Sequence, residues 1–283
     1  MTRSVLVVGI GGATSSGKTT LAKNLAGVLA SASVRVDAVR VLHQDDFTYP
    51  PDQMPWNEKW QVTDWDTPHG AINYERMATV LGHLRAHGEF PHDYKSNEHL
   101  RSEYDCKLSE AQQKEWAERL NGLDHVAVGA TAVPSVTIVI VEGYLLYFSA
   151  KVRRLIDIPL FLRVSRAEMD ARRKSRSNYV LEDGTVWEDP PFYFDEIVWP
   201  AYVEAHAGLF AGRDVEKGVL AEATEQDSTR DGAPVRDLVL FDGHSVPHAK
   251  NMVAVGHVDR NGVKLALAVL ELLLERMTPK KDQ

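Results

Sequence analysis

A short glycine-rich segment near the amino terminus constrains the fold of this chain more than any other feature. It reads Gly12-Ala13-Thr14-Ser15-Ser16-Gly17-Lys18-Thr19, and only Gly11 separates it from the apolar run from Val5 to Ile10. A continuous β-branched run of this kind is typical of a strand buried on both faces of a parallel sheet. The segment from Thr19 to Ala32 has helical spacing, with one apolar face formed by Leu21, Leu25, Val28 and Leu29. The sequence therefore predicts a buried strand, a tight glycine loop and a helix in direct succession.

The residue types of this loop suit the phosphates of ATP. The segment fits the pattern G-x-x-x-x-G-K-[ST], in which glycines let successive backbone N–H groups point at phosphate oxygens. The helix N-terminus adds the positive end of its dipole. Lys18 is expected to act in catalysis by reaching the β- and γ-phosphates, and the Thr19 hydroxyl is expected to ligate Mg²⁺. The other expected ATP-binding residues are Gly12, Thr14, Ser15, Ser16, Gly17 and Thr20. The alternative, an ordinary glycine turn, is disfavoured by the flanking strand and helix.

Strands and helices alternate along the rest of the chain, which predicts an α/β fold with a parallel sheet covered on both faces. Further strands are expected at 34–42, 136–141, 160–164 and 238–241, and helices at 73–87, 109–120, 166–176, 190–209 and 261–277. The chain, residues 1–283, is interpreted as a single domain with inserted segments at 88–135 and 211–236. The second of these is polar and is typical of a disordered excursion. Neither contains a residue that the expected chemistry needs, so both are expected to be dispensable for it.

The strand expected at Val136–Val141 ends in the acidic residue Glu142, followed by Gly143. A carboxylate at the end of a hydrophobic strand next to a P-loop holds Mg²⁺ directly or through water. Glu142 is therefore expected to be a metal ligand together with Thr19. The alternative is a strand-terminal acid that faces solvent.

Two acidic motifs follow, and the first of them is expected at the same edge of the sheet as the glycine loop, because ligands sit beyond the carboxyl ends of parallel strands. The first is His43-Gln44-Asp45-Asp46-Phe47, where a carboxylate can accept the proton of an attacking hydroxyl. The second is Trp65-Asp66, an aromatic residue beside an acid, which suits a flat ring attached to a ribose. From the residues alone, acids that cap a turn explain the first motif equally well. A tryptophan that only packs is then the better interpretation of Trp65.

A cluster of basic residues follows later in the chain, formed by Arg172, Arg173, Lys174 and Arg176, with Tyr179 just beyond it. A mobile basic lid can neutralise negative charge in the transition state of phosphoryl transfer. We therefore expect a lid over residues 171–190. The alternative is a solvated helix face.

Composition limits the classes of partner. The chain of 283 residues has a formal net charge of -8, which makes nucleic acid an unfavourable partner. The one cysteine, Cys106, fits a reducing compartment, and no apolar run is long enough to span a membrane. The expectation is a cytoplasmic protein that acts as a monomer or weak homo-oligomer.

Taken together, these motifs resemble those of the nicotinamide riboside kinase family, a branch of the uridine kinase-like P-loop kinases. The resemblance lies in the order and approximate spacing of the following segments: Gly11–Lys23, His43–Phe47, Trp65-Asp66, Val141–Leu146, Arg172–Arg176, Tyr193–Asp195 and Val198–Tyr202. It implies a five-stranded parallel sheet. It also implies that ATP phosphorylates the ribose 5′-hydroxyl of nicotinamide riboside, which gives nicotinamide mononucleotide in NAD salvage.

The resemblance further implies roles for single residues. Asp45 would be the general base, and Asp66 would accept hydrogen bonds from the ribose hydroxyls with help from Arg173. Trp65 stands where the family has a tyrosine that stacks on the nicotinamide ring, and Tyr179 would cover the other face of the ring. Arg172 and Arg176 would bind ATP. The competing interpretations are a uridine, cytidine or other nucleoside kinase, and a P-loop protein that binds nucleotide without turnover.

Overall fold

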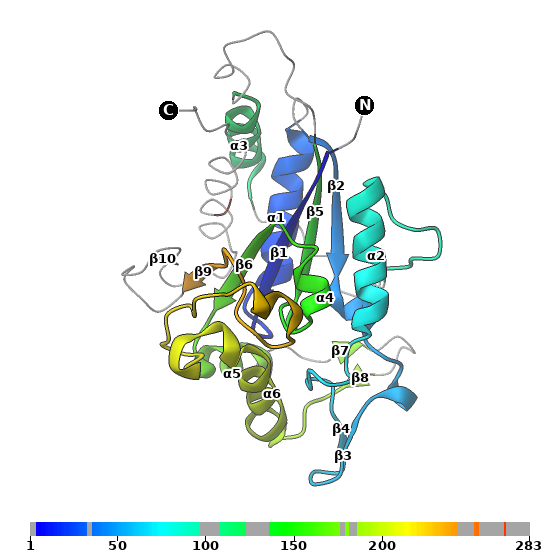
Figure 1. Ribbon diagram of the computed structural model, residues 1–283, viewed down its shortest axis with the longest axis vertical. Helices are drawn as coiled ribbons and strands as arrows, with labels where there is room; N and C mark the ends of the chain where they lie inside the picture. The colour runs from blue at the N-terminus through cyan, green and yellow to red at the C-terminus, as the bar shows by residue number, and fades with distance from the viewer. Residues whose placement is uncertain are drawn as a thin grey trace.

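A parallel sheet forms the centre of the molecule (Figure 1). The computed structural model describes residues 4–32, 36–96, 108–122, 136–175, 179–180, 186–242, 252–254 and 269. The strand order is β10-β9-β6-β1-β5-β2, and every neighbouring pair is parallel. The strands are β1 (Ser4–Gly12), β2 (Val36–His43), β5 (Val136–Gly143), β6 (Ile158–Arg163), β9 (Val239–Asp242) and β10 (Met252–Ala254). The expected five-stranded sheet is therefore confirmed, and the short strand β10 extends it at one edge.

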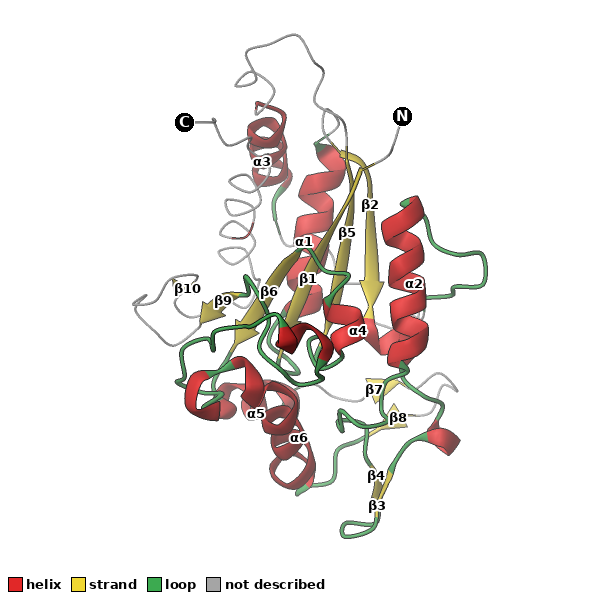
Figure 2. Cartoon of the chain, in the orientation of Figure 1, coloured by secondary structure: helices red, strands yellow, loops and turns green. Residues whose placement is uncertain are grey.

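Helices cover both faces of the sheet (Figure 2). They are α1 (Lys18–Ser31), α2 (Tyr74–His87), α3 (Glu110–Gly122), α4 (Ala150–Arg153), α5 (Arg166–Lys174) and α6 (Trp199–His206). Two short antiparallel pairs lie outside the sheet, β3 (Trp56–Asn57) with β4 (Val62–Thr63), and β7 (Tyr179–Val180) with β8 (Val186–Trp187). The helix expected at 261–277 falls almost wholly outside the described residues. No helix in the part of the chain that the structure describes has the length and apolar character needed to cross a membrane.

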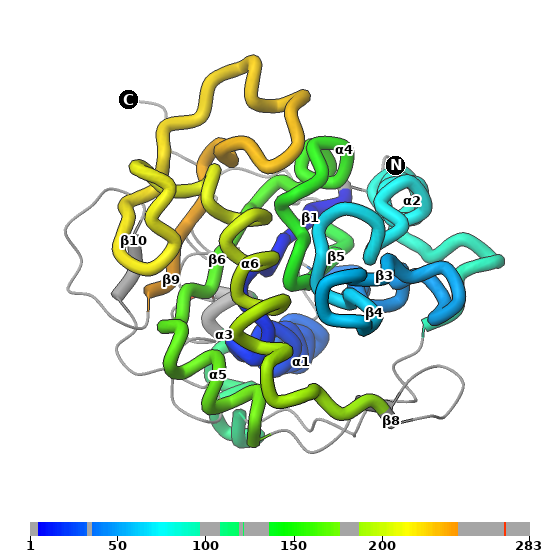
Figure 3. The backbone as a smooth tube through the Cα atoms, turned by 90° about the horizontal axis from the view of Figure 1, so that it is seen from below, coloured from blue at the N-terminus to red at the C-terminus, as the bar shows by residue number. Residues whose placement is uncertain are grey.

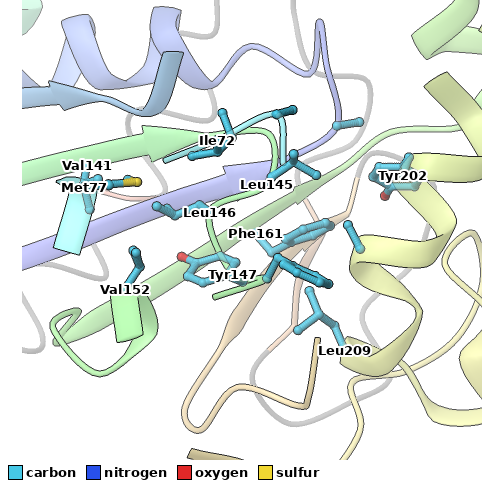
Figure 4. Close-up of a cluster of buried hydrophobic side chains, with 14 of the residues drawn as sticks. Ile72, Met77, Val141, Leu145, Leu146, Tyr147, Val152, Phe161, Tyr202 and Leu209 are labelled. Atoms are coloured by element: carbon cyan, nitrogen blue, oxygen red, sulfur yellow. The ribbon is translucent and has the colours of Figure 1, made fainter. Parts of the chain in front are cut away.

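The alternation of side chains along the strands builds two hydrophobic cores, one on each face of the sheet. In β1, Val7 faces the helices α2, α4 and α6, whereas Val8 and Ile10 face α1 and α3. The first core continues to the end of the sheet through Tyr147, Phe161 and Tyr202, as Figure 4 shows. The apolar run that predicted β1 is thus explained by burial on both faces.

Local sequence signals set several helix ends. The Asn73 side chain accepts a hydrogen bond from the Arg76 backbone N–H at 3.0 Å and so caps α2. Ser109 and Gln112 form a reciprocal capping box at the start of α3, with each side chain accepting from the other residue's N–H. These caps explain why the expected starts of α2 and α3 lie within one residue of those in the structure. The helix expected at 190–209 begins later, at Phe194, and continues into α6.

The expectation of disorder for residues 211–236 is wrong, because this segment is folded against the domain. Val215 and Ala233 are buried, and Phe210 forms a β-bridge with Leu220. The guanidinium of Arg153 donates to the backbone carbonyls of Asp227, Arg230 and Ala233. The segment is polar in composition, yet it is ordered because the buried Arg153 guanidinium binds its backbone carbonyls.

All six strands run in the same direction, so their carboxyl ends meet at one edge of the sheet (Figure 1). Figure 3 looks onto this edge and shows α5 and α6 on one side of the start of α1 and the β3–β4 segment on the other. Parallel α/β proteins place their ligand sites at this edge.

Candidate active site

The glycine loop between β1 and α1 adopts a curled backbone that needs its glycines. Gly12 has φ 147° and Gly17 has φ 96°, values that residues with a side chain rarely adopt. A Cβ atom on Gly12 would also lie 2.5 Å from the backbone oxygen of Leu162. Lys18 is only 8% exposed, and its Nζ donates to the backbone oxygen of Ala13 at 2.7 Å. The loop therefore holds the lysine amine against its own concave face.

Two serine hydroxyls of the loop fit a phosphate ligand. Ser15 Oγ and Ser16 Oγ are buried, and neither has a hydrogen-bond partner within the described residues. A buried hydroxyl is costly without a partner, and phosphate oxygens are strong acceptors. Thr14 borders a small cavity beside the loop, and Thr20 lies half-buried on the first turn of α1. The expected phosphate-binding residues thus lie together on one loop and one helix start.

Thr19 and Glu142 meet at the start of α1. The Thr19 hydroxyl donates to Glu142 Oε1 at 3.1 Å, and His43 Nδ1 lies 2.7 Å from the same oxygen. Glu142 and His43 are both buried. A hydroxyl and a carboxylate are the oxygen ligands that Mg²⁺ takes, usually together with substrate phosphates and water. Among the described residues no group of three or more His, Cys, Asp or Glu side chains could hold a metal ion alone. The pair therefore fits a magnesium ion that is shared with a phosphate.

Asp45 lies exposed on the short helical turn Gln44–Phe47, directly after β2. The turn is fixed on its buried side, because Gln44 is fully buried and its Oε1 accepts from the Leu145 backbone N–H at 2.7 Å. Gly143 allows this contact, since a Cβ atom there would lie 2.5 Å from the Gln44 side chain. The first acidic motif therefore reaches the same edge of the sheet as Glu142.

Asp66 and Arg173 form a buried two-point ion pair, with Nη1 to Oδ1 at 3.2 Å and Nη2 to Oδ2 at 3.3 Å. Asp189 binds the other side of the guanidinium through Arg173 Nε at 2.5 Å and Nη2 at 3.1 Å. Burial raises the pKa of Asp66, although the neighbouring Arg173 charge lowers it. The expected partnership of Asp66 and Arg173 is present, and Asp189 is an additional member that the sequence reasoning missed.

Aromatic residues surround this ion pair. Trp65 is half-buried, its backbone N–H donates to the Tyr193 hydroxyl at 3.0 Å, and its carbonyl accepts from the Tyr144 hydroxyl at 2.7 Å. Trp187 stands edge-on to Trp65 at a centroid distance of 6.1 Å. The buried Trp65 Nε1 has no hydrogen-bond partner within the described residues. Trp65 is thus held by its backbone, and its ring packs beside Trp187 at the edge of the hydrophobic core.

The two acidic motifs approach each other around Tyr144. Burial raises the pKa of this phenol well above its ordinary value, and the charges of Asp66 and Asp45 raise it further. The cavity that Thr14 borders is also lined by Asp66 and Tyr144. The glycine loop and both acidic motifs therefore belong to one site.

Arg172, Arg173 and Lys174 of the basic cluster lie on α5, and the first two reach the same site. Arg172 Nη1 donates to the backbone oxygen of Ser15 at 3.4 Å, and its Nη2 pairs with Glu168 at 2.6 Å. Tyr179 pairs with Trp187 through the β7–β8 ladder, and its side chain lies outside what the structure describes. Arg176 is outside the described residues. The interpretation of the cluster as a solvated helix face is therefore wrong for Arg172 and Arg173.

Several residues of the site carried no signal strong enough for prediction. His43 and Gln44 were visible only as neighbours of Asp45, and His206 is a single histidine in an apolar helix. Asp189 follows Glu188 in an acidic stretch. Their importance comes from contacts between segments that are far apart in the sequence, so local pattern could not identify them.

The strand-loop-helix geometry, the paired Thr19 and Glu142, and the basic helix over the loop define a P-loop kinase of the α/β class. No protein-family model matches the chain. It is 36% identical over 234 residues to nicotinamide riboside kinase of Eremothecium gossypii, covering 83% of this chain and 89% of that protein. It is 30% identical over 251 residues to nicotinamide riboside kinase of Schizosaccharomyces pombe, covering 88% and 99%. Nicotinamide riboside kinase 2 of Mus musculus is 30% identical over 197 residues, covering 70% and 77%. The chain belongs to the nicotinamide riboside kinase family.

Proposed function

We propose that this chain transfers the γ-phosphoryl group of ATP to the ribose 5′-hydroxyl of nicotinamide riboside, which yields nicotinamide mononucleotide for NAD salvage. The observation that carries the proposal is the buried Asp66–Arg173 pair, together with the half-buried Trp65 that directly precedes Asp66 in the chain. A carboxylate held by arginine suits a vicinal diol, and an indole face attracts a flat cationic ring. The family membership of the chain supports the same acceptor.

On this proposal, ATP binds along the glycine loop. Backbone N–H groups and the Ser15 and Ser16 hydroxyls donate to phosphate oxygens. Lys18 leaves the Ala13 carbonyl for the β- and γ-phosphates, and Arg172 closes over the loop from α5. Thr19 and Glu142 would hold Mg²⁺, which when bound neutralises charge on the phosphates.

Asp45 acts as the general base. Its exposed carboxylate at the end of β2 accepts the proton of the 5′-hydroxyl while that oxygen attacks the γ-phosphorus. Asp66 and Arg173 orient the acceptor by binding its ribose hydroxyls. Such positioning supplies much of the rate enhancement of phosphoryl transfer, because little covalent chemistry falls to the protein. Neither competing interpretation, a pyrimidine nucleoside kinase or a non-catalytic protein, is favoured by an observation in the structure.

The test is a comparison of ADP release with nicotinamide riboside, uridine, cytidine and pantothenate as acceptors, in the presence of ATP and magnesium. The proposal expects the highest kcat/KM with nicotinamide riboside. The variant Lys18→Ala is the matched control and should fold but show no transfer. A preference for uridine or cytidine would contradict the proposed acceptor, and activity that persists in Lys18→Ala would contradict the proposed ATP site.

A further inference from the structure

The segment that follows α2 contacts the acidic turn of the proposed active site. Residues 88–96 leave the end of α2 and form the teal loop beside this helix in Figure 1. The Tyr94 hydroxyl donates to Asp46 Oδ2 at 2.6 Å, and the Ser96 hydroxyl donates to the same oxygen at 3.2 Å. Asp46 is the neighbour of Asp45 on the turn Gln44–Phe47. This part of the first insertion therefore reaches a motif that the chemistry needs.

Ring contacts fix the position of Tyr94 independently of its hydroxyl. Its ring stacks on Phe90 at a centroid distance of 4.5 Å and an angle of 9°. It also lies 6.1 Å from the ring of Phe47 at an angle of 25°. Phe47 ends the turn and is buried in the core. One aromatic side chain thus holds the turn twice, through Phe47 and through the carboxylate of Asp46.

Two adjacent carboxylates on a four-residue turn repel each other and compete for donors. The two hydroxyls direct Asp46 toward the inserted segment, and the buried Gln44 anchors the opposite side of the turn. With the turn held from both sides, Asp45 is exposed at the edge of the sheet. A general base must lie within hydrogen-bond reach of the proton that it abstracts, so the orientation of this turn affects the rate of the chemical step.

We propose that Tyr94, assisted by Ser96, is a positioning residue that orients the general base Asp45 by holding Asp46. The inference rests on the proposed phosphoryl transfer and adds to it a function for residues 88–96. It replaces, for these residues, the expectation that the first insertion is dispensable for chemistry.

The test is the variant Tyr94→Phe, which keeps the ring and removes only the hydroxyl. We expect kcat for phosphoryl transfer to fall about tenfold, the scale of a modest misplacement of a catalytic group. The KM for ATP should stay unchanged, because the glycine loop is not altered. The thermal midpoint should fall only slightly, because the aromatic stack is kept and one hydrogen bond is lost. Ser96→Ala should lower kcat in the same direction by a smaller factor.

Two controls separate positioning from general anchoring of the segment. Arg76→Gln removes the contacts of Arg76 with Asp93, which hold the same segment without touching Asp46, and should leave kcat unchanged. In an Asp46→Ala background, Tyr94→Phe should cause no further loss, since its partner is already absent.

The outcomes distinguish this inference from the proposed function. Wild-type kcat in Tyr94→Phe, measured with the acceptor that the wild-type enzyme prefers, would overturn the positioning role alone. Equal losses in Tyr94→Phe and Arg76→Gln would also overturn it, because anchoring would then explain the effect. A wild-type enzyme that prefers another nucleoside overturns only the proposed acceptor, whereas no transfer to any acceptor overturns both.

Discussion

At the residue scale, Asp45 and Glu142 have opposite environments although both lie at the carboxyl ends of strands of the same sheet. Glu142 is buried, whereas Asp45 is exposed. A buried carboxylate that already accepts from Thr19 and His43 suits a fixed metal ligand. An exposed one suits proton transfer with a bound acceptor.

This contrast predicts the effect of Asp45→Asn. We expect kcat to fall by about 10²-fold or more, the scale of losing a general base, while the KM for ATP stays unchanged. Steady-state kinetics with each substrate varied in turn will measure both constants. An unchanged kcat with a raised KM for ATP would instead make Asp45 a nucleotide or metal residue.

Trp65 supports a second prediction. Tyr193 and Tyr144 hold its backbone by hydrogen bonds. The position of Trp65 therefore does not depend on its ring alone, and the ring can contact a ligand. Trp65→Ala should raise the KM for nicotinamide riboside far more than the KM for ATP, because a cation–π contact of about 0.5–2 kcal/mol is lost. Trp65→Tyr should retain most of the activity, since it restores an aromatic face.

A thermal melt separates this effect from loss of packing. Truncation of a core tryptophan costs about 3–5 kcal/mol of stability. A strongly destabilised Trp65→Ala enzyme with an unchanged KM for the riboside would assign Trp65 to the core.

The sequence predicts residues of this site to the extent that each lies in a local motif. Lys18, Thr19 and Glu142 follow from a strand, a loop and a helix that are adjacent in the chain or in the sheet. Asp189 and Tyr94 do not, because their significance depends on contacts across 16 and 48 sequence positions, with Arg173 and Asp46 respectively. Such contacts become visible only when the chain is folded.

At the element scale, the segment 211–236 is ordered although its polar composition predicts disorder. Its residues are polar, yet its backbone carbonyls accept hydrogen bonds from the buried guanidinium of Arg153. Asp231 also accepts from the backbone N–H of Ala150, the first residue of α4. Composition describes only the side chains, so it could not predict order that comes from hydrogen bonds to the main chain.

We therefore predict that Arg153→Leu destabilises the protein by about 3 kcal/mol or more, because several buried carbonyls lose their donor together. Arg154→Leu is the matched control, since Arg154 is exposed and neighbouring, and it should change stability by less than about 0.5 kcal/mol. Chemical denaturation of both variants will measure the difference. Equal stability of the two variants would show that the segment is not held by Arg153.

At the scale of the whole molecule, the parallel sheet brings every part of the proposed mechanism to one edge. The order of strands and helices along the chain predicted this arrangement, because parallel strands all end at the same side. The sequence could not give the sixth strand β10, which has only three residues. It also gave no sign that a buried histidine, His206, would lie beside the glycine loop, where it lines a cavity with Thr14.

His206 makes the stability of the whole molecule depend on pH. The imidazole is 1% exposed, packs against Phe161 and Tyr202, and donates from Nδ1 to the Tyr202 carbonyl at 2.8 Å. Burial, as the largest cause, and the charge of Lys18 together lower its pKa from 6.5 to about 4. The neutral ring is therefore the form that the folded protein accommodates.

The sign of the pH effect follows from this lowered pKa. Above pH 6.5 the histidine is neutral in both the folded and the unfolded chain, so its contribution to stability is fully present. As the pH falls from 6.5 toward 4, the unfolded chain takes up the proton first and the free energy of unfolding decreases. The difference between the two pKa values corresponds to a loss of up to about 3 kcal/mol.

We expect denaturation curves between pH 7.5 and 4.5 to show a steeper loss of stability for the wild-type protein than for His206→Gln. The control His69→Gln removes an exposed imidazole and should keep the wild-type slope. Parallel curves for the wild-type protein and His206→Gln would mean that His206 titrates in the folded protein as it does in the unfolded chain, and the acid sensitivity would then belong to the carboxylates.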